Sequence, residues 1–198
     1  MTFILRSVLC MLMVTITVVH LSAQQWKLDK DNLPKVSITG TSTLSDWEVV
    51  CEGVTGMPDQ LDFDSSKPSQ IIDFGFKVPV ETMDGGRGAS MNDKIKTAFE
   101  STTNPYVTYS QTEPAKVTRS AGSDEFKISS TGTLSMAGLD KSITVECLAV
   151  ITDGVLVISG FKDLKFSEYK MAPPTAMFGQ IKTHDDIVVN YEFRYLKQ

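Results

Sequence analysis

Apolar and polar side chains alternate along most of this chain, with the period of two that is typical of β-strands with one buried face. Residues 72–80 place five apolar side chains on one face and Asp73, Gly75, Lys77 and Pro79 on the other. The C-terminal run repeats the pattern, and further runs lie at 127–136, 142–151 and 155–161. The chain is therefore predicted to be rich in strands.

Turn signals separate these runs at short intervals. Asp153-Gly154 is typical of a two-residue hairpin, because both residues tolerate a positive φ. Residues 121–124 and 138–141 give similar, weaker signals. Many strands with short connections predict one antiparallel barrel or sandwich, formed by a single domain over residues 24–198.

One segment departs from the strand pattern. Ser90–Glu100 places Met91, Ile95 and Phe99 at helical spacing, and Ser90 is suited to cap the first turn. The segment ends before Asn104-Pro105, because the residue before a proline disfavours helical geometry. We expect a short amphipathic helix over one opening of the sheet, where it either closes the core or acts as a lid for a ligand.

The N-terminus indicates export. Arg6 precedes an apolar run at 8–19, and a polar pair follows Ala23. This arrangement predicts a signal peptide over residues 1–23, cleaved after Ala23, and a periplasmic or secreted mature protein. The run is shorter than the ~20 residues of a membrane-spanning helix, which disfavours a retained anchor.

Charge narrows the range of partners. The whole chain has a formal net charge of −5, and loss of Arg6 makes the mature chain one unit more negative. Because no stretch forms a basic patch, we expect no nucleic-acid partner. Asp73, Lys77 and Glu81 lie on the non-core face of one predicted strand, where charges are costly in a bilayer, so we expect no stable membrane insertion.

Residues that could carry chemistry are few. His184 precedes Asp185 and Asp186, but a lone histidine beside two carboxylates at the start of a strand is typical of a solvated turn. We expect no catalytic residue, no metal site and no cofactor other than a bound lipid. Cys51 and Cys147 permit one disulfide after export, or two buried thiols, and the sequence leaves both open.

The remaining functional hypothesis is a barrel that encloses a ligand in its interior. A closed sheet of about eight strands has an interior wide enough for packed side chains or for one small ligand. The candidate apolar lining comes from the inward faces of the strands, the helix and a late loop, and consists of Trp47, Phe74, Phe76, Val78, Met91, Ile95, Phe99, Met136, Met177, Phe178 and Tyr191. The same residues could equally fill a core.

Four motifs, read in order, resemble the YceI-like family of exported lipid-binding barrels. They are TSTLSDWE at 41–48, the helix and proline-started strand at 91–109, TGTLSMAG at 131–138 and PPTAMFG at 173–179. The chain departs from the family at Ser45, where one branch often carries histidine, and at Ser135, which replaces the usual threonine.

The resemblance implies an up-and-down, lipocalin-like barrel with one short helix over an opening. It further implies that the barrel encloses an isoprenoid-like lipid, such as a polyprenol or an isoprenoid quinone tail, for transport, storage or sequestration. It implies no catalytic residues. The alternative is a filled, ligand-free barrel that acts as a structural or protein-interaction module of the cell envelope. A homodimer stays open in both cases.

Overall fold

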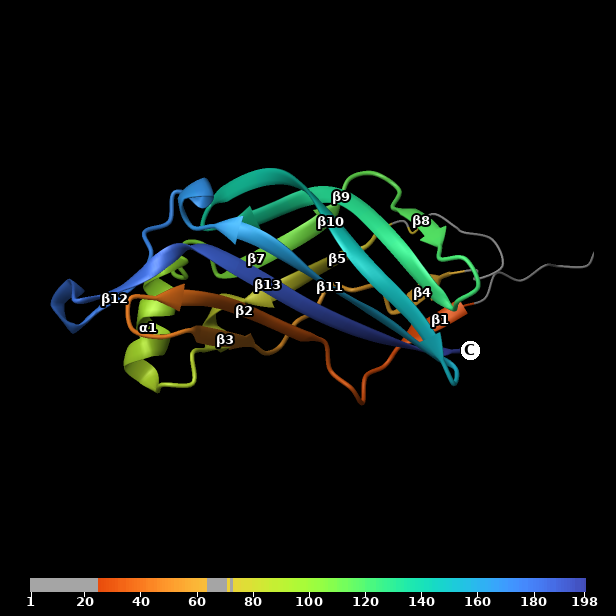
Figure 1. Ribbon diagram of the computed structural model, residues 1–198, viewed down its shortest axis with the longest axis horizontal. Coiled ribbons are helices and arrows are strands. Elements are labelled where there is room, and N and C mark those ends of the chain that lie inside the picture. Colours follow the sequence, from red (N-terminus) through yellow and green to blue (C-terminus); the bar gives the residue numbers. More distant parts are fainter. Residues whose placement is uncertain (1–24, 64–70, 72) are drawn as a thin grey trace, which may run out of the picture.

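A computed structural model describes residues 25–63, 71 and 73–198 of the chain (Figure 1). The predicted signal peptide and its cleavage point lie outside the described residues. The molecule is elongated, and its strands run along the long axis around a common interior. It is an all-β barrel with one α-helix.

Most of the described chain is extended. The strands are β1 (Gln25–Leu28), β2 (Lys35–Ser42), β3 (Trp47–Cys51), β4 (Gln60–Asp62), β5 (Gly75–Pro79), β6 (Met83–Asp84), β7 (Tyr106–Gln111), β8 (Lys116–Arg119), β9 (Glu125–Met136), β10 (Leu139–Thr152), β11 (Val155–Lys165), β12 (Thr175–Ala176) and β13 (Ile181–Lys197). Single turns of 3₁₀ helix lie at Val80–Thr82, Ser167–Tyr169 and Met177–Gly179.

All strand pairs are antiparallel, and the wall is nearly closed. Its order is β5-β7-β9-β10-β11-β13-β2-β3-β6, so that the long last strand, β13, pairs with β2 near the start of the chain. Near the ends of this path, Thr55, just after β3, exchanges two backbone hydrogen bonds with Lys77 of β5. In the part of the chain that the structure describes, this isolated residue pair links β5 to the segment after β3.

Two expectations about the strands need correction. The described residues form 13 strands rather than about eight, because pieces such as β1, β4 and β12 add to the wall but are too short for an alternating pattern to identify them in the sequence. Of the strand predicted at 72–80, the described residues form only β5, and Ile72 lies outside the described residues. Asp73 turns the chain with a φ of 60°, and Val80 begins a 3₁₀ turn instead of continuing the strand.

The inward faces are those that the alternation predicts. On β9 every second side chain from Phe126 to Met136 is buried. On β13 the buried residues include Ile187, Tyr191 and Phe193, and on β10 they include Val145 and Ala149. The predicted Asp153-Gly154 hairpin joins β10 to β11, with positive φ at both residues. Hydrophobic burial on one face therefore sets the register of the wall.

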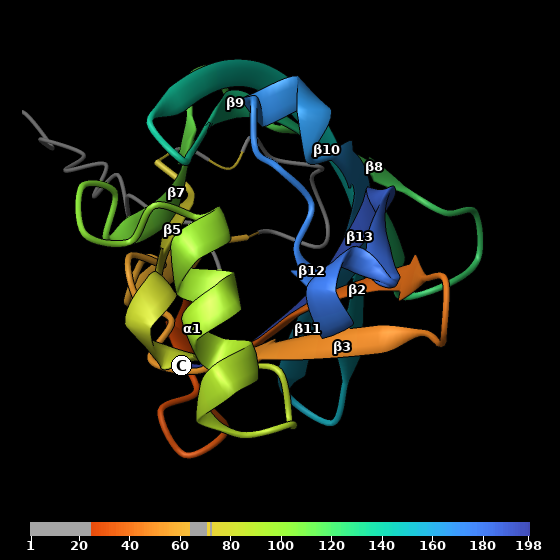
Figure 2. The ribbon, with the colours of Figure 1, turned by 90° about the vertical axis from the view of Figure 1, so that its left-hand side faces the viewer.

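The helix α1 (Ala89–Ala98) lies across one end of the barrel (Figure 2). It begins after Gly88, which has a φ of 81° and provides no side-chain cap, so the predicted capping role of Ser90 is wrong. Its apolar face packs inward through Ile95, and Phe99 at its C-terminal end is also buried. Within the described residues, no helix combines the length and the apolar character needed to cross a bilayer.

The opposite end of the barrel is closed by aromatic side chains, which we call the floor. Trp26 of β1 is fully buried and its Nε1 donates a hydrogen bond to the carbonyl of Phe63 at 3.0 Å. Phe63 in turn meets Phe126 edge to face, with ring centroids 4.9 Å apart. Because β1 pairs with both β13 and β4, Trp26 joins three strands at this end.

Asp29, directly after β1, predicts a stability loss in acid. The pKa of the Asp29 carboxyl lies below its ordinary value of 3.8, chiefly because it accepts hydrogen bonds from Asn32 and from the backbone of Asp31. The charge of Arg194 also lowers this pKa, while burial raises it. A carboxyl with a lowered folded-state pKa stabilises the fold above its unfolded-state pKa and loses that contribution as the pH falls through the folded-state value.

We therefore expect Asp29→Asn to lower the urea midpoint at pH 7 and to weaken its decrease between pH 5 and pH 2, a range that includes the unfolded-state pKa of about 3.9 and extends below it. The matched control is Asp31→Asn, because the side chain of Asp31 is exposed in the same turn. Equal effects of the two substitutions would contradict the prediction.

Candidate functional site

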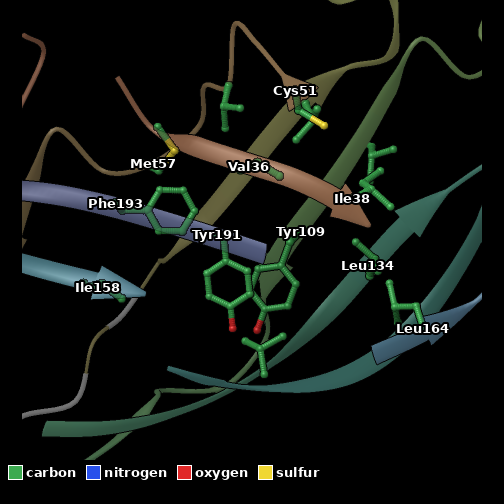
Figure 3. Close-up of a cluster of buried hydrophobic side chains, with 14 of the residues drawn as sticks. Val36, Ile38, Cys51, Met57, Tyr109, Leu134, Ile158, Leu164, Tyr191 and Phe193 are labelled. Atoms are coloured by element: carbon green, nitrogen blue, oxygen red, sulfur yellow. The ribbon is translucent and has the colours of Figure 1, made fainter. Parts of the chain in front are cut away.

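The interior of the barrel contains a cavity of about 60 Å³, which we call the inner cavity. Its wall is almost wholly apolar and is formed by side chains from β2, β3, β5, β7, β9, β10, β11 and β13. Figure 3 shows several of these side chains converging from opposite strands. An enclosed space of this kind excludes water and favours an apolar occupant.

A second cavity, of about 100 Å³, lies under α1 and is called the mouth cavity. Its apolar wall includes Trp47, Ile95 and Phe166, while Arg87 and Lys94 bring positive charge to its edge. The side chain of Lys94 reaches across to β12, where its Nζ donates a hydrogen bond to the carbonyl of Thr175 at 2.6 Å. The mouth cavity is therefore apolar inside and polar at its edge.

The two cavities adjoin. Ile38 of β2 and Phe99 after α1 belong to the walls of both, and each is almost fully buried. These two side chains lie at the boundary that the cavities share. A chain-like guest that occupied both cavities would contact Ile38 and Phe99.

Nine of the eleven predicted lining residues lie on these walls. Phe74, Phe76, Val78, Met136 and Tyr191 line the inner cavity, Trp47, Met91 and Ile95 line the mouth cavity, and Phe99 lines both. Met177 and Phe178 were predicted to line the interior, and this is wrong. The chain has positive φ at both residues, which turns their side chains into solvent.

Sequence reasoning missed the polar part of the inner wall. Tyr109 of β7 and Ser130 of β9 are buried on inward faces, and their hydroxyls are 2.8 Å apart. Alternation around each residue could have found them, since both occupy buried positions of their strands. Their polar character concealed them, because the search was for apolar lining.

Two glycines make room for the tyrosines that face each other across the inner cavity. A Cβ at Gly132 would lie 2.6 Å from the Tyr109 ring, and a Cβ at Gly160 would lie 2.6 Å from the Tyr191 hydroxyl. In both places a neighbouring backbone oxygen is also too close for a side chain. The two phenol rings therefore lie flat against the wall, and Figure 3 shows their hydroxyls directed to the same region.

The hydroxyls of this group differ in how fully they are bonded. Tyr191 donates to the carbonyl of Glu146 at 3.1 Å and contacts the sulfur of Cys147 at 3.6 Å. Tyr109 and Ser130 have two hydroxyl protons, and the bond between them uses one. No other partner within the described residues accepts the second proton. Burial raises the pKa of both tyrosines, so both phenols stay protonated.

Lys162 brings a charged group to the same wall. It lies on the inward face of β11, where the pairing of β10 with β11 ends at Glu146 and Phe161. Its Nζ donates to the carbonyl of Thr144 at 2.9 Å and so spans the place where the two strands separate. The ammonium thus replaces a missing strand-to-strand hydrogen bond.

Cys51 and Cys147 are both free thiols in the structure. Their strands, β3 and β10, are four positions apart around the wall, so the two residues line the inner cavity from different sides. The sequence left open a disulfide or two unpaired thiols, and in the structure the two cysteines are unpaired. Alternation identified the inward faces correctly but contains no information on distance around the barrel.

Burial makes both thiols poor nucleophiles. It raises the pKa of Cys51 to about 12 and also raises the pKa of Cys147. Because the thiolate is the reactive species, we expect iodoacetamide at pH 8 to label the folded mature chain at least ~100-fold more slowly than the urea-unfolded chain. Rapid labelling of the folded chain, followed by mass spectrometry, would contradict this assignment of the thiols to the interior.

His184 and the two aspartates that follow it do not form one site. His184 Nδ1 is 2.8 Å from the hydroxyl of Thr41, Asp185 accepts hydrogen bonds from Ser167, and Asp186 pairs with Lys165. Among the described residues there is no group of three or more His, Cys, Asp or Glu side chains that could hold a metal ion. His184 is exposed on β13, and its imidazole is hydrogen-bonded to Thr41 of β2.

Similarity to solved structures decides the fold. No family model matches the sequence, and no curated protein matches it. BcnA of Burkholderia cenocepacia superposes with a TM-score of 0.64 and 18% identity, over 81% of this chain and 95% of that one. The chain has the fold of the YceI-like proteins. The resemblance predicted from the four motifs is thereby confirmed at the level of the fold.

Two further structures support this YceI-like fold. A polyisoprenoid binding domain from Saccharophagus degradans, implicated in plant cell wall breakdown, has a TM-score of 0.58 and 10% identity over 89% of this chain and 99% of that one. The YceI protein of Campylobacter jejuni has a TM-score of 0.57 and 16% identity over 76% and 84%. At such identities the comparisons show that the fold is shared.

Proposed function

We propose that this YceI-like chain is an exported protein that binds an apolar, isoprenoid-like lipid, such as a polyprenol or an isoprenoid quinone tail, for transport, storage or sequestration. The observation that carries the proposal is the inner cavity, which is lined by apolar side chains and adjoins a mouth cavity with a polar edge. A polyisoprenoid binding domain with the same fold supports it.

Each part of such a guest has a matching surface. The tail would occupy the inner cavity, where burial contributes ~0.8 kcal/mol per CH₂ group before ordering costs. A polar head would remain near Arg87 and Lys94 at the mouth. The second hydroxyl proton of the Tyr109–Ser130 pair would bond to a water or to an oxygen of the guest, since a buried donor without a partner is costly.

The size of the cavities requires the lining to move. A cavity of about 150 Å³ holds a benzene-sized guest, and the inner cavity is smaller than that. A long tail would therefore displace side chains, and Met83 and Met136 are suited to this because methionine side chains are flexible.

The same small volume favours a second candidate function. If the lining does not move, the barrel is a filled, ligand-free module that acts through its outer surface on other envelope proteins. The two candidates differ in one property, since only the carrier retains a lipid through purification.

Mass spectrometry of an organic extract tests this difference. The mature chain 24–198 is purified without detergent, and the extract is compared with that of the same chain unfolded in urea, refolded and then offered polyprenols and quinones. A long-chain lipid at close to one molecule per chain supports the carrier. Empty extracts from both preparations would reject it and leave the filled barrel.

Export is tested separately. When the whole chain is expressed in a bacterium with an outer membrane, the periplasmic fraction is expected to contain a protein that begins at Gln24 by intact mass. A cytoplasmic protein that keeps residues 1–23 would contradict both the export and the compartment.

A further inference from the structure

Three apolar side chains stand in solvent beside the mouth cavity. Phe178 is fully exposed, Leu44 is 67% exposed and Met177 is 64% exposed. They lie on two loops, the turn between β2 and β3 and the turn between β12 and β13, which we call the apolar tip. In Figure 1 the second of these turns projects beyond α1 at the left-hand end.

The two loops form one unit. Thr43 donates its backbone N–H to the carbonyl of Lys182 at 3.0 Å, and the backbone N–H of Lys182 returns a bond to the hydroxyl of Thr43 at 3.1 Å. Ser42 closes the first loop by accepting from the backbone of Leu44 and of Ser45. The exposed side chains are therefore held in place by loops that are bonded to one another.

The backbone of the tip is under strain that folding does not explain. Met177 and Phe178 have φ values of 50° and 53°, a region that costs about 1–2 kcal/mol for a residue with a side chain. Two consecutive strained residues that expose large apolar groups gain no burial in return. Strain and exposure at the same residues indicate a surface that is covered by a binding partner.

The chemistry of the tip favours a lipid bilayer as the binding partner. The turn between β12 and β13 lies in a stretch without a charged residue from Met171 to Ile181, whereas the turn between β2 and β3 ends at Asp46. Insertion of the turn that carries Met177 and Phe178 therefore desolvates no ion of its own. The tip is also continuous with the mouth cavity, because Ser42, Ser45, Thr175, Ala176 and Ile181 line that cavity while their neighbours form the tip. An apolar tail could then pass from a bilayer to the mouth cavity without crossing water.

We propose that the apolar tip, formed by Leu44, Met177 and Phe178, docks the mouth of the barrel transiently on a lipid bilayer through apolar insertion. This deepens the proposed function and rests on it for its purpose, but docking itself is measured without any cargo. Because the turn that carries Met177 and Phe178 has no charged residue, its insertion is expected to depend little on anionic lipid or on salt. This surface contact differs from a stable insertion of the barrel.

A tryptophan reporter at the tip tests the proposal. Phe178→Trp of the mature chain is mixed with vesicles of phosphatidylcholine, and a blue shift of the new fluorescence is expected, equal in low and high salt. The matched control is Phe161→Trp, which replaces an aromatic residue that is 61% exposed on the wall. No shift at position 178, or an equal shift at 161, would overturn the proposal.

A loss-of-function variant completes the test. Met177→Ser combined with Phe178→Ser is expected to reduce flotation with the same vesicles at least ~tenfold, as for removal of two inserted apolar side chains. Unchanged flotation of the double variant would overturn the docking proposal. A wild-type protein that is a dimer in gel filtration, and that the double substitution converts to a monomer, would also overturn it, because the tip would then contact a second copy of the chain. If the protein docks on vesicles but its organic extract is empty, the carrier proposal is rejected and the docking proposal stands. If the extract contains lipid but the protein does not dock, the docking proposal is rejected and the carrier proposal stands.

Discussion

Val145→Phe is expected to leave the barrel folded and to lower the amount of co-purifying lipid per chain at least ~tenfold. Val145 is buried on the inward face of β10 and lines the inner cavity, so the larger ring would occupy the space that the tail needs. Exclusion of only two CH₂ groups costs ~1.6 kcal/mol, which is about tenfold in affinity. Mass spectrometry of the extract, normalised to protein, gives the result.

Leu148→Phe is the matched control, because Leu148 lies on the outward face of the same strand and is exposed. Its lipid content is expected to equal that of the wild type. Overpacking in Val145→Phe is expected to reduce the free energy of unfolding by only about 1–3 kcal/mol, so circular dichroism should be unchanged. A folded Val145→Phe chain with full lipid content would show that the guest does not occupy the inner cavity.

Trp26→Ala is expected to reduce the free energy of unfolding by about 3–5 kcal/mol. The indole is fully buried in the floor, and its Nε1 donates to the carbonyl of Phe63, so the substitution leaves both a void and an unpaired acceptor. Because β1 holds β13 and β4 together at this end, the loss should extend beyond one contact. Equilibrium unfolding in urea, followed by circular dichroism, measures the change.

Trp26→Phe separates the two causes. It keeps most of the buried apolar volume and removes the hydrogen bond, so its cost is expected to be smaller, about 1–3 kcal/mol. If Trp26→Ala and Trp26→Phe had the same effect, the hydrogen bond rather than the filled floor would hold this end together. Less than 1 kcal/mol for Trp26→Ala would contradict the role of Trp26 altogether, given the ~1 kcal/mol typical of point mutations.

Alternation in the sequence was sufficient to predict the inward faces. Burial of Ile128, Leu134 and Met136 on β9 followed from the period of two, because one face of a strand in a barrel must leave water. Met177 and Phe178 were placed in the lining because they are apolar residues of a late loop, and that prediction was wrong because the turn exposes both side chains. Hydrophobicity alone does not reveal a positive φ at residues other than glycine, and φ decides where those two side chains point.

Other features were beyond the reach of sequence patterns for different reasons. The short strands β1, β4 and β12 have too few residues to show a period, so the strand number was underestimated. Gly132 and Gly160 are recognised as positions of close approach only when Tyr109 and Tyr191 are seen to lie over them. Alternation could place Tyr109 and Ser130 on inward faces, but the contact between their hydroxyls depends on the register between β7 and β9, which local alternation does not encode.

The contrast between the two ends of the barrel has a thermodynamic consequence. Among the described residues, the end at Trp26 and Phe63 is packed with aromatic rings, while the other end carries the mouth cavity. If the protein is the proposed carrier, a guest that enters tail first would leave head first along the same route. Loading and release would then be the forward and reverse directions of one equilibrium, and the chemical potential of the lipid in the donor and in the acceptor would decide the direction of net transfer.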